Sequence, residues 1–186
     1  GDLLVASYLS GQKAKAAQTL RKALWHAFRF GEDVPADAPR LESAVPGSLQ
    51  PFHWEIEFPE VFLGERKGFD AIVGNPPFKG GQRISGDLGS AYLAYLKEWQ
   101  ENRSGSADLC CYFYLRAYEK LRPGGCFGLI ATNTIAQGDT REMGLDQIVA
   151  TGGCIYHAEN NTPWPGAAAV VVDVVLVCKG LWQGPR

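Results

Sequence analysis

The chain has 186 residues, of which 46% are hydrophobic and 20% are charged, and its formal net charge at pH 7 is −2. This length and composition fit one globular domain and exclude a disordered chain, and no apolar run approaches the length of a transmembrane span. The near-neutral charge excludes a basic surface over the whole protein, so contacts with nucleic acid would need a local patch.

The first 51 residues are predicted to form a helical lead-in and a linker. Apolar residues spaced three and four apart over residues 3–30 indicate one or two amphipathic helices, whereas residues 31–51 are rich in Pro, Ala, Asp and Ser without periodicity. The chain does not begin with methionine, and its only methionine is Met143, so we expect a piece of a longer polypeptide. Nor does it begin with a signal peptide, and we expect an intracellular protein.

A strand that ends in two prolines is the most informative feature. Residues 52–62 alternate apolar and polar side chains and predict a short strand or extended segment. The apolar residues 69–74 predict a buried parallel strand, which must end at Asn75 because Pro76 and Pro77 have no N–H to donate. Ligands of open α/β sheets bind at the carboxyl ends of such strands, so the sequence predicts a site at this turn.

The groups at this turn can bind a planar amino group. The amide oxygen of Asn75 and the carbonyl oxygen of Pro76 are two acceptors for the two hydrogens of one nitrogen. The ring of Phe78 offers a face on which a base could stack.

Residues 79–89 are rich in glycine and predict a flexible loop. Its cations, Lys79 and Arg83, could neutralise the phosphates that flank a displaced base, although a mobile surface loop without that role is an alternative. Residues 91–100 then predict a short helix with apolar residues on one side.

A second strand follows an apolar helix. Residues 107–121 predict the helix, with Ser106 as its N-cap and Asp108 as an acid favoured by the helix dipole. A Pro-Gly-Gly stop and the apolar strand 126–131 come next, and this order predicts a right-handed β-α-β crossover with the first strand. The polar segment 132–141 should therefore lie beside the first site.

The C-terminal part predicts two more strands, residues 154–159 and 170–178. Asp173 interrupts the apolar run of the second, and its charge must be exposed or paired. Trp164 lies between the strands, where a tryptophan often only packs a loop. The five cysteines lie in apolar runs without Cys-x-x-Cys spacing and the three histidines are scattered, so we expect reduced, buried thiols and no metal site.

Several segments resemble one enzyme family. Asn-Pro-Pro-Phe at 75–78 resembles the catalytic motif of amino-group methyltransferases that use S-adenosylmethionine, above all the adenine-specific DNA methyltransferases. Three further segments resemble the type IIL subgroup of the large single-chain restriction–modification enzymes, which comprise types IIG and IIL. They are the Ala-Asp-Leu helix start at 107–109, the Thr-Asn-Thr-Ile-Ala-Gln-Gly segment at 132–138 and the Trp-x-Gly-x-Ala-Ala segment at 164–169. The resemblance covers about residues 52–179.

The resemblance implies an α/β fold, namely the C-terminal half of a Rossmann-like class I methyltransferase sheet with parallel strands, helical crossovers and a terminal antiparallel strand pair. Residues 52–186 would form the substrate-facing half of the catalytic domain, after the lead-in and linker of residues 1–51. The family's strand and Gly-rich loop for the methyl donor are not found before Phe69. The donor-binding half, the DNA-recognition domain and any nuclease domain would then lie elsewhere in the polypeptide, and this chain alone would be inactive.

The implied reaction transfers a methyl group from S-adenosylmethionine to the exocyclic amino group of an adenine flipped out of double-stranded DNA, in the cytoplasm of a prokaryote. The residues implied to act in catalysis are Asn75, Pro76, Pro77 and Phe78, and Asn75 would also face the cofactor. The residues implied to contact the base or its phosphates are Phe78, Lys79, Arg83 and Trp164, with Trp164 lying against the base.

Three alternatives stay open. The same Asn-Pro-Pro-aromatic motif methylates glutamine amides in proteins and guanine amino groups in RNA. A different class is a non-catalytic remnant that binds only DNA or a partner. No Pro-Cys dipeptide occurs in the chain, so the nucleophile used to methylate the cytosine ring carbon is missing.

Overall fold

The computed structural model describes residues 52–100, 106–164 and 170–184. The helices and linker predicted in residues 1–51 lie outside the described residues. The described residues fall into two compact units, and the chain passes from the larger to the smaller unit within one helix. The smaller unit contains residues 52–57 and 85–100, and the larger contains residues 58–84, 106–164 and 170–184.

The smaller unit is helical. It contains α3 (Trp54–Glu57), the last residues of α5 (Gly81–Leu88) and α6 (Ser90–Trp99). The predicted helix at residues 91–100 is confirmed by α6, whose Leu96 is buried. None of the helices in the part of the chain that the structure describes is long and apolar enough to cross a membrane.

The strand or extended segment predicted in residues 52–62 is wrong, because these residues form α3 and α4 (Pro59–Phe62). The first residue of α4 is a proline, whose fixed φ suits that position and whose missing N–H has no helical partner there anyway. The rings of Phe58 and Phe62, four residues apart, both pack edge-on against Phe69 at centroid distances of 5.6 and 5.2 Å. A spacing of four residues puts both rings on one side of a helix, so these contacts favour a helix although the apolar–polar alternation suggests a strand.

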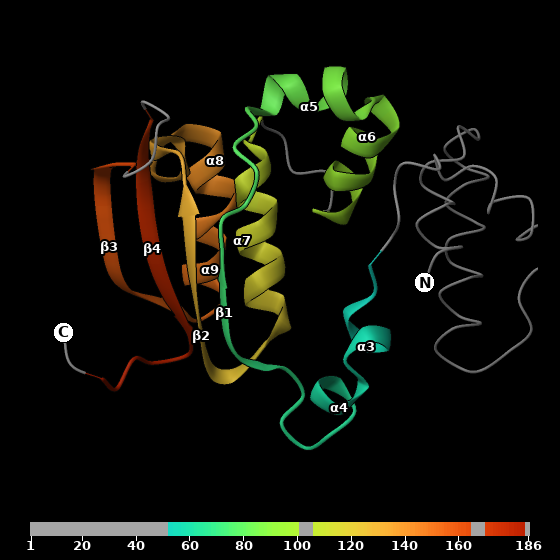
Figure 1. Cartoon of the computed structure of the whole chain (residues 1–186), viewed down its shortest axis with the longest axis vertical. Coiled ribbons are helices and arrows are strands. Elements are labelled where there is room, and N and C mark those ends of the chain that lie inside the picture. Colours follow the sequence, from blue (N-terminus) through green and yellow to red (C-terminus); the bar gives the residue numbers. More distant parts are fainter. Residues whose placement is uncertain (1–51, 101–105, 165–169, 185–186) are drawn as a thin grey trace, which may run out of the picture. The chain divides into compact units, whose positions relative to one another are not determined.

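The larger unit is built on a four-stranded sheet in the order β1-β2-β4-β3 (Figure 1). Its strands are β1 (Phe69–Gly74), β2 (Leu121–Ala131), β3 (Gly153–Pro163) and β4 (Val171–Lys179). Strands β1 and β2 are parallel, whereas β4 is antiparallel to both β2 and β3. The predicted fold class is therefore confirmed, with a parallel pair joined by helices and a terminal antiparallel pair. The prediction that the first strand is buried is wrong, because β1 is the edge strand of the described sheet and none of its residues is buried.

Strand β2 starts earlier than predicted. It begins directly after α7 (Leu109–Lys120), so the Pro-Gly-Gly stop at residues 123–125 lies inside the strand. The register with β1 shifts between Phe69 and Ala71, and Gly124 has a φ of 77°, which suits glycine. The helix therefore ends at Lys120, before the predicted stop, because Leu121 is already extended. The Pro-Gly-Gly residues instead lie where the pairing of β2 with β1 is irregular.

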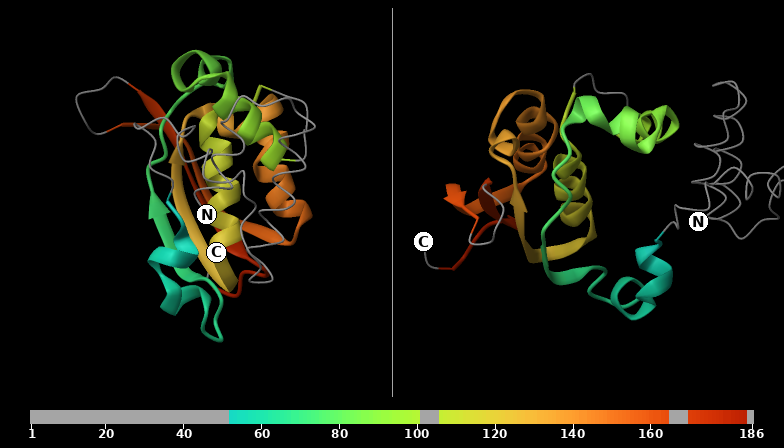
Figure 2. Two further views of the ribbon diagram at one scale, coloured as in Figure 1. Left: turned by 90° about the vertical axis from the view of Figure 1, so that its right-hand side faces the viewer. Right: turned by 45° about the horizontal axis from the view of Figure 1, so that its top comes forward.

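Helices cover one face of the sheet. The crossover helix α7 lies there together with α8 (Gly138–Met143) and α9 (Leu145–Ala150), as two further views show (Figure 2). The core lies between α7 and this face, where the rings of Tyr114 and Phe127 meet edge-on at 5.4 Å and both side chains are buried. The β-branched run of β4 supplies further buried residues of this core.

All five cysteines are free thiols, as predicted. Cys110, Cys111 and Cys178 are buried, but Cys126 and Cys154 are only half-buried. Burial raises the pKa of Cys110 to about 12, so this thiol stays protonated at neutral pH and acts as a small apolar side chain. Among the residues that the structure describes, no three His, Cys, Asp or Glu side chains are placed to hold a metal ion.

One buried hydrogen bond of the core gives a stability prediction. The hydroxyl of Tyr114 donates to the carbonyl of Leu129 at 2.8 Å, and burial raises the pKa of Tyr114, so the hydroxyl stays a donor. Tyr114→Phe leaves that carbonyl without this partner and should lower the free energy of unfolding by about 1–2 kcal/mol. The control is Tyr118→Phe on the same helix, whose exposed hydroxyl bonds Thr151 at 3.3 Å and should change stability by less than about 0.5 kcal/mol. Urea titrations compare them, and equal effects would contradict the prediction.

Candidate active site

The candidate site lies where the chain leaves β1. The strand ends at Gly74, which pairs with Leu129 of β2, and residues 75–78 continue beyond the sheet. Because β1 and β2 are parallel, the segment after β2 leaves at the same edge, as predicted. Asn75 is exposed, whereas Pro76 is buried, so the buried proline anchors a turn that presents the amide to solvent.

Phe78 and Trp164 come from opposite sides of this edge. Phe78 follows β1 and is 39% exposed, and Trp164 follows β3 and is half-buried. The pairings bring the end of β3 to the same edge as the end of β1, but β2 and β4 lie between them. Three strand spacings amount to about 14 Å. No ring contact joins Phe78 and Trp164, both of which the structure describes, and the backbone N–H of Trp164 instead donates to the carbonyl of Val170 at 2.9 Å.

The flexible loop predicted at residues 79–89 is largely the helix α5, so this prediction is wrong. Its Ile84 is fully buried, which holds the segment in place. At Gly81 a Cβ atom would clash with the carbonyl oxygen of Ser106, so glycine allows a close approach of two backbone segments of the chain. The sequence showed the glycines but not the buried isoleucine contact that makes the segment helical.

The two predicted phosphate contacts lie just after Phe78. Lys79 is half-buried, and its backbone carbonyl accepts the N–H of Leu109 at 2.8 Å. Arg83 is exposed in the first turn of α5. Both cations therefore lie in the segment that directly follows the candidate site, and Arg83 is accessible to solvent.

Asp108 joins the segments that follow β1 and β2. Its Oδ1 accepts the backbone N–H of Gly81 at 2.9 Å, and its Oδ2 accepts the hydroxyl of Thr134 at 2.6 Å. Its own N–H donates to Oγ1 of Thr140 at 3.0 Å. The predicted capping is wrong, because Asp108 and not Ser106 is the N-cap residue of α7, and no side-chain bond caps that helix. Sequence reasoning missed this junction.

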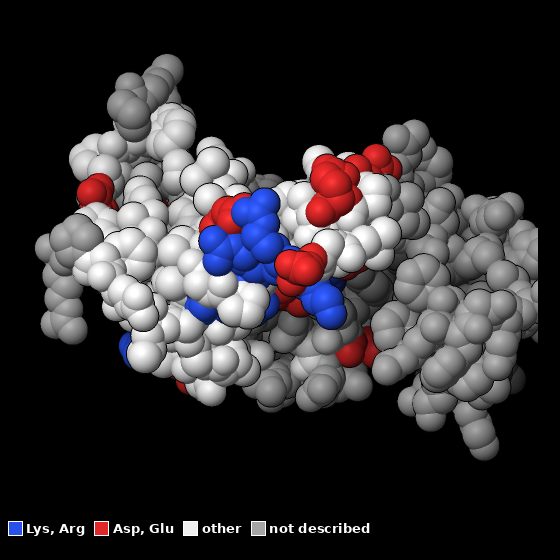
Figure 3. All heavy atoms as spheres, turned by 90° about the horizontal axis from the view of Figure 1, so that it is seen from below, with Lys and Arg blue, Asp and Glu red and all other residues white. Residues whose placement is uncertain are grey.

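A group of ion pairs lies near the starts of β1 and β2, at the other end of these strands from the candidate site. Asp70 accepts a hydrogen bond from Arg122 at 2.7 Å and pairs with Arg66 at 3.3 Å, and the bond from Arg122 lowers the pKa of the Asp70 carboxyl. Seen from below, basic side chains lie beside acidic ones on this face (Figure 3). The charges there are locally balanced, so this face does not present a continuous basic surface for DNA.

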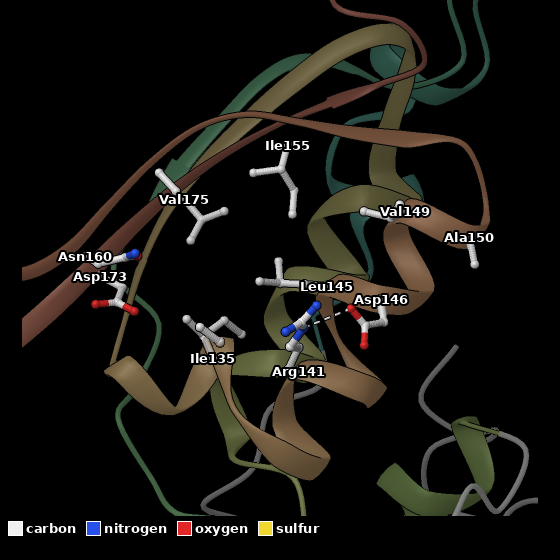
Figure 4. A pocket seen from close by; sticks show the side chains of 12 residues that line it. Ile135, Arg141, Leu145, Asp146, Val149, Ala150, Ile155, Asn160, Asp173 and Val175 are labelled. Carbon is white, nitrogen blue, oxygen red and sulfur yellow. Dashed lines mark hydrogen bonds and ion pairs between the residues drawn. The ribbon is translucent and has the colours of Figure 1, made fainter.

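A pocket of about 510 Å³ lies on the helix-covered face of the sheet (Figure 4). Its lining comes from η2 (Asn133–Ala136), α8, α9, β3 and β4 and is mainly apolar. Arg141 and Asp146 form an ion pair of 3.1 Å at its wall. None of the seven site residues predicted from the sequence lines this pocket, so it does not define the predicted base-binding site.

Asp173 lies in the wall of this pocket and is 2% exposed. Its Oδ1 accepts the backbone N–H of Asn161 at 2.8 Å. The expectation that this charge must be exposed or paired is wrong, because the side chain is buried and its described partner is a neutral backbone N–H. Asn161 has a φ of 55° in an irregular part of the β3–β4 ladder, which turns its N–H toward the carboxylate.

Comparison with known proteins identifies one family. The model of the Eco57I restriction-modification methylase family matches residues 9–150. A curated protein of Methanocaldococcus jannaschii, whose name describes a type II restriction enzyme and methyltransferase, is 28% identical over 126 residues. That match covers 67% of this chain and 9% of the relative.

The fold is also found in a solved structure. The type IIL restriction-modification enzyme MmeI, solved in complex with DNA, aligns with a TM-score of 0.57 and 20% identity over 90% of this chain. The alignment covers 22% of the MmeI chain. This chain therefore spans a small part of the length of both proteins.

Proposed function

Because the chain belongs to the Eco57I restriction-modification methylase family, we propose that it is the substrate-facing part of an adenine-specific DNA methyltransferase. The observation that carries this proposal is the exposed amide of Asn75, held at the carboxyl end of a parallel strand by a buried proline. Such an enzyme would modify DNA in the cytoplasm of a prokaryotic cell as part of a restriction–modification system.

The unpaired lateral side of β1 supports the proposal that the complete protein has a larger sheet. Among the described strands β1 pairs only with β2, and its Val73 is 85% exposed although it is apolar. An unpaired strand edge presents backbone N–H and C=O groups with which a further strand can pair. A donor-binding half elsewhere in the same polypeptide could cover this edge, which agrees with the small share of each relative that the chain spans.

The chain's own residues can bind the amino group. Flipping an adenine out of the duplex costs a few kcal/mol in lost stacking, and stacking on Phe78 would return about 1–3 kcal/mol. The amide oxygen of Asn75 and the carbonyl of Pro76 would accept the two amino hydrogens and stabilise the positive charge that develops on the nitrogen. Pro76 and Pro77 stiffen the turn, so these acceptors need little reorganisation.

S-adenosylmethionine, when bound, supplies the methyl group. The described residues fit this donor only in part, because Asn75 is the exposed polar group at the strand end and the residues for the rest of the donor would lie outside this chain. The amino nitrogen would form a bond to the methyl carbon while the carbon–sulfur bond of the donor breaks and its electron pair stays on sulfur. The nitrogen would then lose a proton to solvent, and the transfer would need no covalent enzyme intermediate. Lys79 and Arg83 would neutralise flanking phosphates, and Trp164 would contact the base from the far side of the sheet edge.

The full-length enzyme is expected to label duplex DNA with tritiated S-adenosylmethionine, and nucleoside analysis should give N6-methyladenine. This chain alone should transfer no methyl group, since the proposal places part of the donor site elsewhere in the polypeptide. RNA and total protein are parallel substrates. Labelling of guanine in RNA or of glutamine in protein, without labelled DNA, would replace the proposed substrate. Binding of DNA by a full-length protein that labels none of the three would indicate a non-catalytic remnant.

A further inference from the structure

The carboxylate at the start of α7 is turned away from its own helix. An aspartate at an N-cap position usually accepts an N–H of the first helical turn. Asp108 has the extended backbone of an N-cap residue, but its side chain makes no such bond. Both carboxylate oxygens are instead used outside the helix, by Gly81 and by Thr134. Capping of α7 therefore does not explain why Asp108 bonds to Gly81 and Thr134.

The partners of Asp108 belong to the segments that leave two adjacent parallel strands. Gly81 lies six residues after Asn75, and Thr134 lies just beyond the end of β2. The partners are 27 and 26 residues away from Asp108 in sequence. A single carboxylate thus links the segment that carries Asn75 and Phe78 to the end of the neighbouring strand.

The segment after β1 is held to the start of α7 by short hydrogen bonds and by a close approach of the two backbones. The bond from Thr134 is 2.6 Å long, as expected for a hydroxyl that donates to a carboxylate. A second tie, from Leu109 N–H to the carbonyl of Lys79, lies beside it at 2.8 Å. Gly81 lies so close to the backbone of Ser106 and Ala107 that a Cβ atom would not fit. Between these ties and β1, two of the residues are prolines, so little freedom remains for the turn.

We infer that Asp108 is a positioning residue that holds the Asn75–Phe78 turn in the geometry needed for methyl transfer. This inference rests on the proposed function for its chemical meaning, although the hydrogen bonds to Gly81 and Thr134 are independent of it. Asp108 acts through the turn and needs no contact with the base. Misplacing a reacting group by as little as 1 Å can lower a rate strongly, so loss of the link should reduce turnover more than DNA binding.

The chain offers a matched control in Asp139. Its Oδ2 accepts the backbone N–H of Ser106 at 2.7 Å, so it also holds the start of α7. It has no hydrogen bond to Gly81 or Thr134, whose bonds to Asp108 the structure describes. Asp139→Ala therefore removes a carboxylate that supports the same helix end but leaves the turn linked to β2.

The test uses the full-length enzyme with three variants, Asp108→Ala, Asp108→Asn and Asp139→Ala. Asp108→Ala should lower kcat by about tenfold and leave the KM for DNA within about twofold. Asp108→Asn should stay within about threefold of the parent, because its amide oxygen still accepts from Gly81 and its NH₂ can donate to Thr134. Thr134 could then donate to Thr132, whose Oγ1 lies 2.7 Å from its own.

Hydrogen–deuterium exchange of residues 74–84 provides a readout that needs no activity. Exchange there should rise in Asp108→Ala and not in Asp139→Ala, while exchange within α7 stays as in the parent. Unchanged exchange in residues 74–84 of Asp108→Ala would overturn the inference, and so would raised exchange with the kcat of the parent. A rise in exchange throughout the protein would also overturn it, since Asp108 would then be a general stabiliser. If the parent labels no DNA, the proposed function fails, and exchange alone decides whether Asp108 holds the turn.

Discussion

Asn75→Ala in the full-length enzyme should lower the rate of methyl transfer by about a hundredfold or more, because it removes an oriented acceptor used at the chemical step. Asn75 is exposed after the end of β1, so the substitution should leave the fold and the stability nearly unchanged. Single-turnover methylation of duplex DNA measures the rate, and urea titration checks the fold. Binding of DNA should fall much less than the rate.

Two further variants separate the acceptor from its surroundings. Asn133→Ala removes another exposed asparagine, which follows the adjacent strand at the same edge, and should stay within about threefold of the parent. Asn75→Asp keeps an acceptor oxygen and should lose less activity than Asn75→Ala. Methyl transfer by Asn75→Ala within a factor of about three of the parent would rule out the proposed role of this amide.

The sheet could be predicted because its signals are local. Two prolines in a row must end a strand, and the β-branched run of β4 has few other structures open to it. The apolar helix between β1 and β2 required a parallel pair, and the structure has one. The position of Asn75 at the carboxyl edge followed from the strand end alone.

The short helices could not be predicted because contacts distant in sequence decide them. The rings of Phe58 and Phe62 favour a helical turn only because Phe69 lies against both. Residues 81–88 look like a loop by composition, and they become helical with Ile84 fully buried and Gly81 against another backbone. Propensity is a weak guide where such packing is available.

The junction at Asp108 was missed for the same reason. Its sequence neighbours suggest only a helix start, and its partners Gly81 and Thr134 become visible once β1 and β2 lie side by side. The proposed contact of Trp164 with the same base as Phe78 stays a prediction. The strand order shows only that the two residues follow the outermost strands β3 and β1, with β4 and β2 between them.

Capture of a flipped base should depend on Phe78. If its ring stacks on the extruded adenine, Phe78→Ala should weaken capture by about 1–3 kcal/mol, which is about fivefold to 150-fold in the equilibrium between stacked and captured base. Phe78→Tyr should be tolerated because stacking requires a ring. A duplex with 2-aminopurine at the target position brightens when the base leaves the stack, so the parent should give a large fluorescence increase and Phe78→Ala a smaller one.

The matched control for this experiment is Phe113→Ala. Phe113 is 43% exposed on α7, close to the 39% of Phe78, but it does not follow a strand end. Its replacement should leave the fluorescence increase unchanged. Trp164→Ala should lower it less than Phe78→Ala, because Trp164 must reach across two intervening strands. If Phe78→Ala and Trp164→Ala both matched the parent at saturating protein, even with methylation impaired, neither ring would hold the base and both would be ordinary packing residues.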